Sequence, residues 1–345
     1  MKTPTTLQEA VTYFSDPDRA HEYAVWLRWP NGVACPKMGC GSASVQAIKT
    51  RRTWRCKECK WVFSAKVGTI YESSNISFTK WFPAIWFLAN TKNGTSSHEL
   101  GRALGVTQKT AWFMLHRIRE AMAPTENRMF DGEVEADETF VGGRRKATMV
   151  TGLGFKKMKH GPTEGKTMVF GMAERNGRGK SRVKAMVVGG RKRSELVPHI
   201  RSSVFPGSAI YTDALLSYRN LPDYQHRFID HAVTYCEGRV HTNTIENFWS
   251  CLKRTLHGTY IAPRPFHLDA YVDEQVFRFN AREENDSDRF IATVKNTEGK
   301  RLSYQQLICA NPSFRLGQNG PIHRVQDTPV QVPPQQIPLP PERPS

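Results

Sequence analysis

The fold is organised around residues 241–254, His241-Thr-Asn-Thr-Ile-Glu-Asn-Phe-Trp-Ser-Cys-Leu-Lys-Arg254. Read as a helix, this stretch places its apolar side chains on one face, because they recur at helical spacing: Ile245, Trp249, Leu252 and Leu256. Glu246 and Lys253 then share a second, polar face. For one helix alone, a solvated charged face is the simpler interpretation.

Two carboxylates upstream favour a different interpretation of Glu246. Asp137 lies in the strand-like run 132–141, and Asp213 ends the apolar run 209–213. Three carboxylates from separate elements are what a two-metal phosphoryl-transfer site requires. Hard oxygen ligands select Mg²⁺ or Mn²⁺, so we expect two such ions held by Asp137, Asp213 and Glu246.

Spacing alone leaves the choice of carboxylates open. Glu135 and Glu138 flank Asp137 in the same strand-like run. Asp213 competes with Asp223 and Asp230, although it follows the most apolar run. We predict Asp137 as the ligand that bridges both metals, with Asp213 and Glu246 each completing one side.

Residues near the Glu246 helix have two interpretations each. His241 and Asn243 are candidates to position substrate or the attacking water, but an Asn at this place is most simply a helix cap. Lys253 and Arg254 are candidate phosphate contacts, with solvent exposure as the alternative.

The charge of the chain predicts a polyanionic partner. The 345 residues carry 49 Lys and Arg against 32 Asp and Glu, a net charge of +17. Double-stranded DNA is the simplest partner, although ribosome-associated and membrane-surface proteins share this charge. There is no apolar run of membrane-spanning length and no apolar signal segment at the start, so we expect a cytoplasmic protein without membrane contact.

Four of the seven cysteines are paired in sequence as Cys35-x4-Cys40 and Cys56-x2-Cys59. Two such knuckles, joined by a hairpin with strands near 44–48 and 53–56, suit a structural tetrahedral zinc. The alternative is four unrelated buried thiols. Arg51 and Arg52 lie in this basic hairpin and either face phosphate or are merely solvated. The remaining cysteines are expected to be small buried residues: Cys236, Cys251 and Cys309.

Residues 95–122 have the pattern of a helix, a turn and a second helix. Ser96 and Glu99 fit a capping box, Gly105 ends the first helix, and Thr107 caps the second. This pattern is typical of DNA-binding helix-turn-helix units, in which Lys109 and Arg117 would contact DNA. A helical hairpin that only packs is the alternative.

The chain after residue 130 predicts an α/β layered domain. We expect strands near 132–141, 167–174, 182–188, 209–213 and 232–236, and helices near 194–204, 243–256 and 266–282. Residues 142–165 are rich in Gly, Lys and Arg, including Arg144 and Arg145, without apolar periodicity. We predict for them a basic loop that becomes ordered on a polyanion.

These motifs resemble those of bacterial insertion-sequence transposases of the zinc-ribbon type. The likeness is carried by Val134-Glu-Ala-Asp-Glu-Thr-Phe-Val-Gly-Gly, Ile210-Tyr-Thr-Asp213, His241 to Tyr260, and Phe277-Arg-Phe-Asn-x-Arg282, and covers roughly residues 10–282. The N-terminal match includes Arg28-Trp-Pro-Asn-Gly-Val-Ala-Cys-Pro and Cys56-Lys-x-Cys59. The C-x4-C knuckle and the Pro-rich tail depart from the family pattern.

The resemblance implies an RNase H-like mixed sheet with flanking helices and a catalytic Asp-Asp-Glu set, preceded by a zinc ribbon and a helix-turn-helix. It also implies metal-dependent DNA cleavage and strand transfer at inverted terminal repeats, by an oligomer that is nucleoid-associated when bound. The expected segments are a helical lead-in (1–30), a zinc ribbon (31–70), a helical DNA-binding domain (71–124), a catalytic domain (130–283), an appendix (284–327) and a disordered tail (328–345).

We therefore predict a DNA transposase. One alternative is a DNA-binding regulator with a zinc ribbon, a helix-turn-helix and a silent nuclease-like domain, against which the presence of all three carboxylates argues. The other is a structure-specific or RNA-directed nuclease on the same fold.

Overall fold

The computed structural model describes residues 3–125, 128–142, 148–151, 154–157, 165–177, 179–213, 215–218, 220–229, 240–261 and 263–308. Several predicted features lie outside these residues: the strand near 232–236, the side chains of Arg144 and Arg145, Cys236, Cys309 and the Pro-rich tail.

The chain begins with two short helices and a three-stranded antiparallel ribbon. Helices α1 (Leu7–Phe14) and α2 (Pro17–Arg28) are capped by Thr6 and Asp16, whose side chains accept backbone N–H groups. Strands β1 (Val45–Ile48) and β2 (Thr53–Cys56) pair across a turn with Arg52 in the left-handed region, and β3 (Val62–Ser64) adds to β2. The predicted hairpin is confirmed; its third strand was not predicted.

Three helices follow, and their apolar faces form one core with α1 and α2. Helix α3 (Phe78–Asn90) is buried along most of its length, so its aromatic side chains serve packing. Helices α4 (Ser97–Leu104) and α5 (Gln108–Met122) are joined through Gly105, whose φ is +59°. The predicted capping box of Ser96 and Glu99 and the cap by Thr107 are both present.

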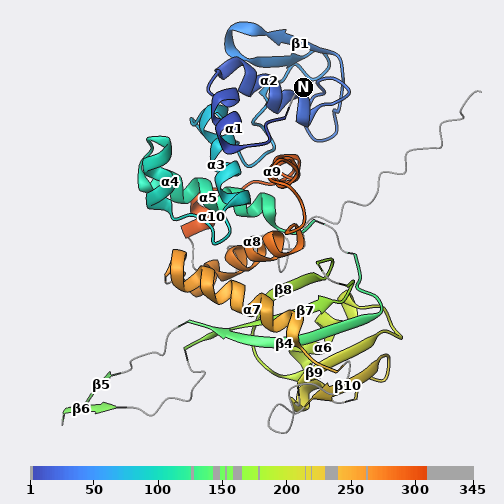
Figure 1. Cartoon of the computed structure of the whole chain (residues 1–345). Coiled ribbons are helices and arrows are strands. Elements are labelled where there is room, and N and C mark those ends of the chain that lie inside the picture. Colours follow the sequence, from blue (N-terminus) through green and yellow to red (C-terminus); the bar gives the residue numbers. More distant parts are fainter. Residues whose placement is uncertain are drawn as a thin grey trace, which may run out of the picture. The chain divides into compact units, whose positions relative to one another are not determined.

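The next layer is a five-stranded mixed sheet in the order β10-β9-β4-β7-β8 (Figure 1). Its strands are β4 (Glu133–Val141), β7 (Thr167–Glu174), β8 (Arg182–Val188), β9 (Ala209–Asp213) and β10 (Gln225–Ile229). β7 is antiparallel to β4 and β8, whereas β9 is parallel to β4 and β10. This order and these directions confirm the predicted RNase H-like sheet.

Alternating residues divide the sheet into two covered faces. Val134, Ala136 and Phe170 pack beneath α6 (Arg193–Ser203) on one face. Val169 and Ala173 on the other face pack against α7 (Asn243–Thr255) and α8 (Leu268–Asn280), which lie side by side (Figure 1). Because side chains alternate along a strand, Glu135 and Asp137 belong to the α7 face, and Glu138 belongs to the α6 face.

Three features of these elements differ from the predictions. Strand β10 was not predicted, because its residues are mostly polar and show little alternation of apolar and polar side chains. Residues 142–165 are not loop throughout, because Thr148–Thr151 (β5) and Gly154–Lys157 (β6) pair antiparallel; the β-branched residues of the first strand favour this. Cys251 is only partly buried.

The chain from residue 256 returns to the N-terminal helices. A π-helical turn (Leu256–Tyr260) and a short 3₁₀ turn (Pro265–His267) lead into α8. Helices α9 (Asp286–Lys295) and α10 (Tyr304–Ile308) follow, and Phe290 of α9 inserts among the aromatic rings of α1 and α3. None of the described helices is long and apolar enough to cross a membrane.

Candidate functional site

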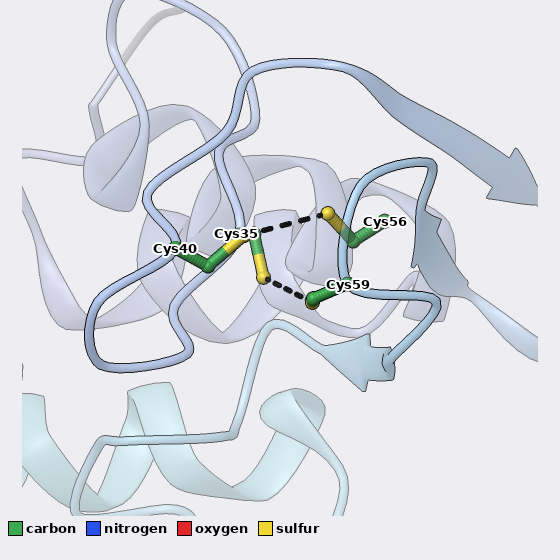
Figure 2. Close-up of side chains that lie close together, drawn as sticks. All are labelled: Cys35, Cys40, Cys56 and Cys59. Carbon is green, nitrogen blue, oxygen red and sulfur yellow. Dashed lines mark hydrogen bonds between the residues drawn. The ribbon is translucent and has the colours of Figure 1, made fainter.

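The four paired cysteines converge into one cluster (Figure 2). The sulfur atoms of Cys35 and Cys59 are 3.7 Å apart, and those of Cys40 and Cys56 are also 3.7 Å apart. Four sulfurs around a tetrahedral zinc with bonds of about 2.3 Å would be separated by about 3.8 Å. The cluster therefore fits a structural zinc ion, and the alternative of four unrelated thiols is wrong.

The longer first knuckle closes without distortion of the cluster. The backbone N–H of Cys40 donates to the carbonyl of Lys37, and Gly39 and Gly41 adopt φ of +78° and +58°. In the second knuckle, the backbone N–H groups of Cys59 and Glu58 point at the sulfur of Cys56 and lower the pKa of that thiol to about 7. A lowered pKa favours the thiolate form of Cys56 that binds metal, whereas burial raises the pKa of Cys35 to about 12.

A second cluster lies where β4 and β9 run side by side. Carboxylate oxygens of Asp137, Glu138 and Asp213 lie within 4.8 Å of one another. The registers of Val134 with Ile210 and Glu135 with Tyr211 place Asp137 and Asp213 at adjacent positions of two parallel strands. The structure thus brings together two of the three predicted catalytic carboxylates.

Electrostatics at this cluster favour a cation. Burial, followed by the charge of Glu138, raises the pKa of Asp137 to about 7, and the charge of Asp213 adds to this. Burial also raises the pKa of Glu138. Hard carboxylate donors held close together suit Mg²⁺ or Mn²⁺, which would relieve the repulsion among them.

Helix α7 is fixed to Asp137 by a direct hydrogen bond. The indole Nε1–H of Trp249 donates to Oδ2 of Asp137 over 2.9 Å. Gly171, which pairs with Asp137 across β4 and β7, leaves the space that this indole needs. A Cβ at position 171 would lie 2.6 Å from Cη2 of Trp249 and 2.9 Å from Cδ1 of Ile245.

A buried ionic network fixes the N-terminal end of the same helix. Glu135 is fully buried, and its Oε2 accepts the backbone N–H of Ile245 over 2.9 Å. Its Oε1 accepts from Nε of Arg175 over 2.7 Å, and Nη2 of Arg175 lies 2.9 Å from Nδ1 of His241. In the sequence, Glu135 was only a rival to Asp137 as a metal ligand, because no local pattern marks a helix cap supplied by a distant strand. Arg175, which pairs with Glu135, was not predicted.

Glu246 does not join the cluster of Asp137, Glu138 and Asp213. It is exposed in the first turn of α7, and its Oε1 accepts from the hydroxyl of Thr242 over 2.7 Å. It precedes Trp249 by three residues, so the two side chains are neighbours on the helix surface, although Glu246 lies on the exposed polar face. The prediction that Asn243 caps this helix is wrong: Thr242 occupies the cap position, and the carboxylate of Glu135 takes a first-turn N–H.

His241 contacts the buried ionic network at the start of α7, and its predicted contact with substrate or water stays a prediction. Its ring and its carbonyl oxygen both meet the guanidinium of Arg175, and its Nδ1 lies 3.5 Å from Oε1 of Glu135.

The predicted DNA-binding cations fall into three groups. Arg51, Lys109, Lys253 and Arg254 are exposed. Arg52 is exposed but pairs with Asp18 at 2.6 Å. Arg117 is buried and donates to the carbonyls of Ile70, Glu72 and Leu302, so its guanidinium ties α5 to neighbouring segments and is not available to DNA.

Two sequence families match the chain. Residues 129–280 match the ISXO2-like transposase domain, and this match includes Asp137, Asp213 and Glu246. Residues 15–61 match the transposase zinc-ribbon domain, which includes all four clustered cysteines.

Relatives of the chain carry transposon names. An uncharacterized protein in transposable element ISH50 of Halobacterium salinarum is 29% identical over 69% of this chain and 82% of its own length. An uncharacterized transposase-like protein of Haemophilus influenzae is 34% identical over 30% of this chain and 85% of its own length. The crystal structure of a pre-cleavage Mos1 transpososome was also matched, over 64% of this chain and 79% of the matched chain. The sequence identity is 11% and the TM-score is 0.17, so this match does not establish a common fold.

Proposed function

Because the chain belongs to the insertion-sequence transposases with a zinc ribbon and an ISXO2-like transposase domain, we propose that it cuts DNA at the ends of its element and joins them to target DNA. The observation that carries this proposal is the convergence of Asp137 and Asp213 on adjacent parallel strands. Phosphodiester cleavage needs charge stabilisation at both the attacking and the leaving oxygen, and paired carboxylates are the groups that hold metal ions for this purpose.

The proposed metal ligands are Asp137, Asp213 and Glu246. Two divalent ions, when bound, would activate the attacking oxygen and stabilise the leaving one. Asp137 is central because Trp249 orients its carboxylate and the adjacent strand supplies Asp213. Glu246 would serve by turning away from Thr242 toward Asp137.

Glu138 is a weaker candidate for the third ligand than Glu246. Its Oε2 accepts from the hydroxyl of Tyr218 over 2.7 Å, and its Oε1 pairs with Arg191 at 2.9 Å. Oε2 is hydrogen-bonded, whereas Oε1 has the ion pair but no hydrogen-bond partner in the described structure, and both contacts belong to the α6 face. A carboxylate held in this way supports the shape of the cluster and would need to give up two partners to bind metal directly.

DNA recognition would come from the N-terminal segments. The zinc ribbon presents Arg51, and the second helix of the helix-turn-helix presents Lys109, both in contact with solvent. Binding of the element's terminal repeats and assembly of several copies on DNA are parts of the same proposal, because strand transfer requires two ends to be held together.

The test is a cleavage and joining assay on duplex DNA that carries the element's ends, in Mg²⁺. We expect nicking followed by strand transfer with the unmodified chain. Asp137→Asn and Asp213→Asn should each lower the rate by about a thousandfold or more, while DNA affinity is retained. Unchanged nicking by both variants would refute the proposal. Nicking without any joined product from pre-cleaved ends would indicate a nuclease instead.

A further inference from the structure

A cavity of about 380 Å³ beside α7 is lined by cations and by no acidic residue among the described residues. It lies where α7 and α8 meet the end of α3 and the start of α9. The cations that line it are Lys92, Arg254, Arg278, Arg282 and Arg289.

The innermost of these cations carries unsatisfied donors. Arg278 is 8% exposed, and within the described part of the chain its Nε and Nη1 have no hydrogen-bond partner. Burial lowers the pKa of Arg278 to about 10, so the guanidinium is still charged at neutral pH. A buried guanidinium with two unpaired donor atoms is costly unless an anion approaches.

Among the described residues, one carboxylate contacts Arg278 beneath the cavity, and it cannot neutralise all the cations there. Glu274 is fully buried and bonds Nη2 of Arg278, Nε of Arg119 over 2.5 Å and the hydroxyl of Tyr260 over 2.5 Å. Two buried guanidinium groups thus share a single carboxylate, and Nη1 and Nη2 of Arg119 also lack partners in the described structure. The floor of the cavity therefore has an excess positive charge.

The rim of the cavity adds exposed cations. In the described structure Lys92 and Arg254 form no ion pair. Arg289 pairs with Asp286, and Arg282 lies 4.0 Å from Glu283 while its Nη1 donates to the carbonyl of Ser181 over 2.8 Å. These pairs only partly offset the local charge.

A second cavity of about 580 Å³ lies at the start of α7. The two share Asn247, Phe279 and Arg282, and the second is also lined by Asn243, Arg175 and Glu133, of which the last two form an ion pair. The α7 residues that line the two cavities include Asn243, Asn247, Cys251 and Arg254, which recur at helical spacing on one side of the helix, here called the α7 groove. From Asn243 to Arg254 this helix is about 16 Å long, which corresponds to the rise of roughly five nucleotides in one strand.

We propose that the α7 groove binds the phosphodiester backbone of the DNA on which the Asp137–Asp213 site acts. This inference rests on the proposed function and deepens it by naming where the strand lies. The length of the groove favours a nucleic-acid backbone over a single free phosphate, which would fill only one end. Arg278 supplies the buried charge, and Lys92 and Arg254 supply the outer phosphate contacts.

The first experiment measures binding of a labelled DNA duplex over a series of salt concentrations, without divalent metal. The double variant Lys92→Gln/Arg254→Gln removes two unpaired, exposed cations from the groove. It should bind DNA about tenfold more weakly and reduce the slope of log Kd against log salt by about 1.8, or about 0.9 for each lost phosphate contact. The control, Lys192→Gln/Lys295→Gln, removes the same charge from exposed positions outside the groove. Equal effects of the two variants would overturn the proposal.

The second experiment uses Cys251, a partly exposed thiol that lines the same cavity, as a probe in the unmodified chain. We expect saturating DNA to slow maleimide labelling of the peptide that contains Cys251 severalfold. Inorganic phosphate alone should have little effect. Labelling that DNA leaves unchanged would contradict the proposal, and protection by phosphate alone would show a small-anion site instead of a DNA site.

Failure of this inference can be told apart from failure of the proposed function. Normal Mg²⁺-dependent nicking together with an unchanged salt slope in the groove variant would reject the groove alone. Absence of nicking by the unmodified chain, with the salt slope reduced as expected, would reject the catalytic proposal and retain the groove as a DNA-binding surface.

Discussion

The two candidate metal clusters of this chain are built in different ways. Cys35 and Cys59, the outer ligands of the thiol cluster, are only 24 residues apart, and one short ribbon brings all four sulfurs together. Asp137 and Asp213 come from strands separated along the chain by β5 to β8 and α6, and Glu246 comes from a helix beyond β10. The first cluster depends on local turns, whereas the second depends on how α7 docks onto the sheet.

This difference predicts where each cluster is vulnerable. The thiol cluster should fail only when a ligand or the metal is removed. The carboxylate cluster should also lose its geometry when residues that touch no metal are substituted, because Glu135, Gly171 and Trp249 determine where α7 lies.

The largest effect is expected for Cys59→Ser. Loss of one of four thiolates should abolish tight zinc binding and unfold the ribbon, since a structural zinc contributes on the order of 10 kcal/mol. Zinc content per chain and proteolysis of the ribbon measure this, and the sheet domain should stay resistant. Cys251→Ser, outside the cluster, should keep its zinc. A full equivalent of zinc in Cys59→Ser would break the comparison.

A smaller effect is expected for Gly171→Ala. The added Cβ would overlap the indole of Trp249, so the helix must shift away from Asp137. We expect a loss of about 1–3 kcal/mol in the free energy of unfolding, together with slower nicking. Gly190→Ala is the matched control, because a Cβ there meets nothing within 4 Å. If both variants unfold at the same denaturant concentration and nick equally, docking of α7 does not control the site.

The metal-free chain should show a pH-dependent gain in stability from Asp137→Asn. The pKa of Asp137 rises from 3.8 to about 7 in the fold, so the folded state holds an additional proton between these values. Its contribution to stability therefore falls as pH rises from about 4 to 7. Asparagine lacks this titration, so the gain should be absent below pH 4 and reach up to about 4 kcal/mol above pH 7. Chemical denaturation at several pH values measures it, and a gain independent of pH would contradict the assignment.

The smallest effect is expected at Arg52. Its ion pair with Asp18 is exposed, so Arg52→Gln should change stability by less than about 1 kcal/mol. If pairing holds Arg52 away from phosphate, Arg51→Gln should weaken DNA binding more than Arg52→Gln does. A binding titration of the two variants decides this, and the reverse order would assign the phosphate contact to Arg52.

Sequence patterns predicted the features that depend on neighbours in the chain. Knuckle spacing located the thiol cluster, capping residues located α4 and α5, and apolar runs located β7, β8 and β9. The same local signals misjudged Arg117, because a basic residue on a helix looks exposed unless the carbonyls that bury it are known.

The features that sequence could not predict arise from contacts between distant elements. Glu135 caps α7 from another strand, and Gly171 is required only because Trp249 crosses the sheet at that point. Our preference for Asp137 rests on contacts between distant elements: Glu135 is engaged by Ile245 and Arg175, and Glu138 lies on the α6 face. Motif resemblance identified Glu246, but its side chain bonds Thr242 instead of the carboxylate cluster.

The most direct test of the account is Mn²⁺ binding to the DNA-bound chain, measured by electron paramagnetic resonance in variants of each carboxylate. We predict that Asp137→Asn, Asp213→Asn and Glu246→Gln each lose bound Mn²⁺, whereas Glu138→Gln retains it. Retention in Glu246→Gln together with loss in Glu138→Gln would contradict the proposed set of ligands, and full binding in Asp137→Asn and Asp213→Asn would contradict the site itself.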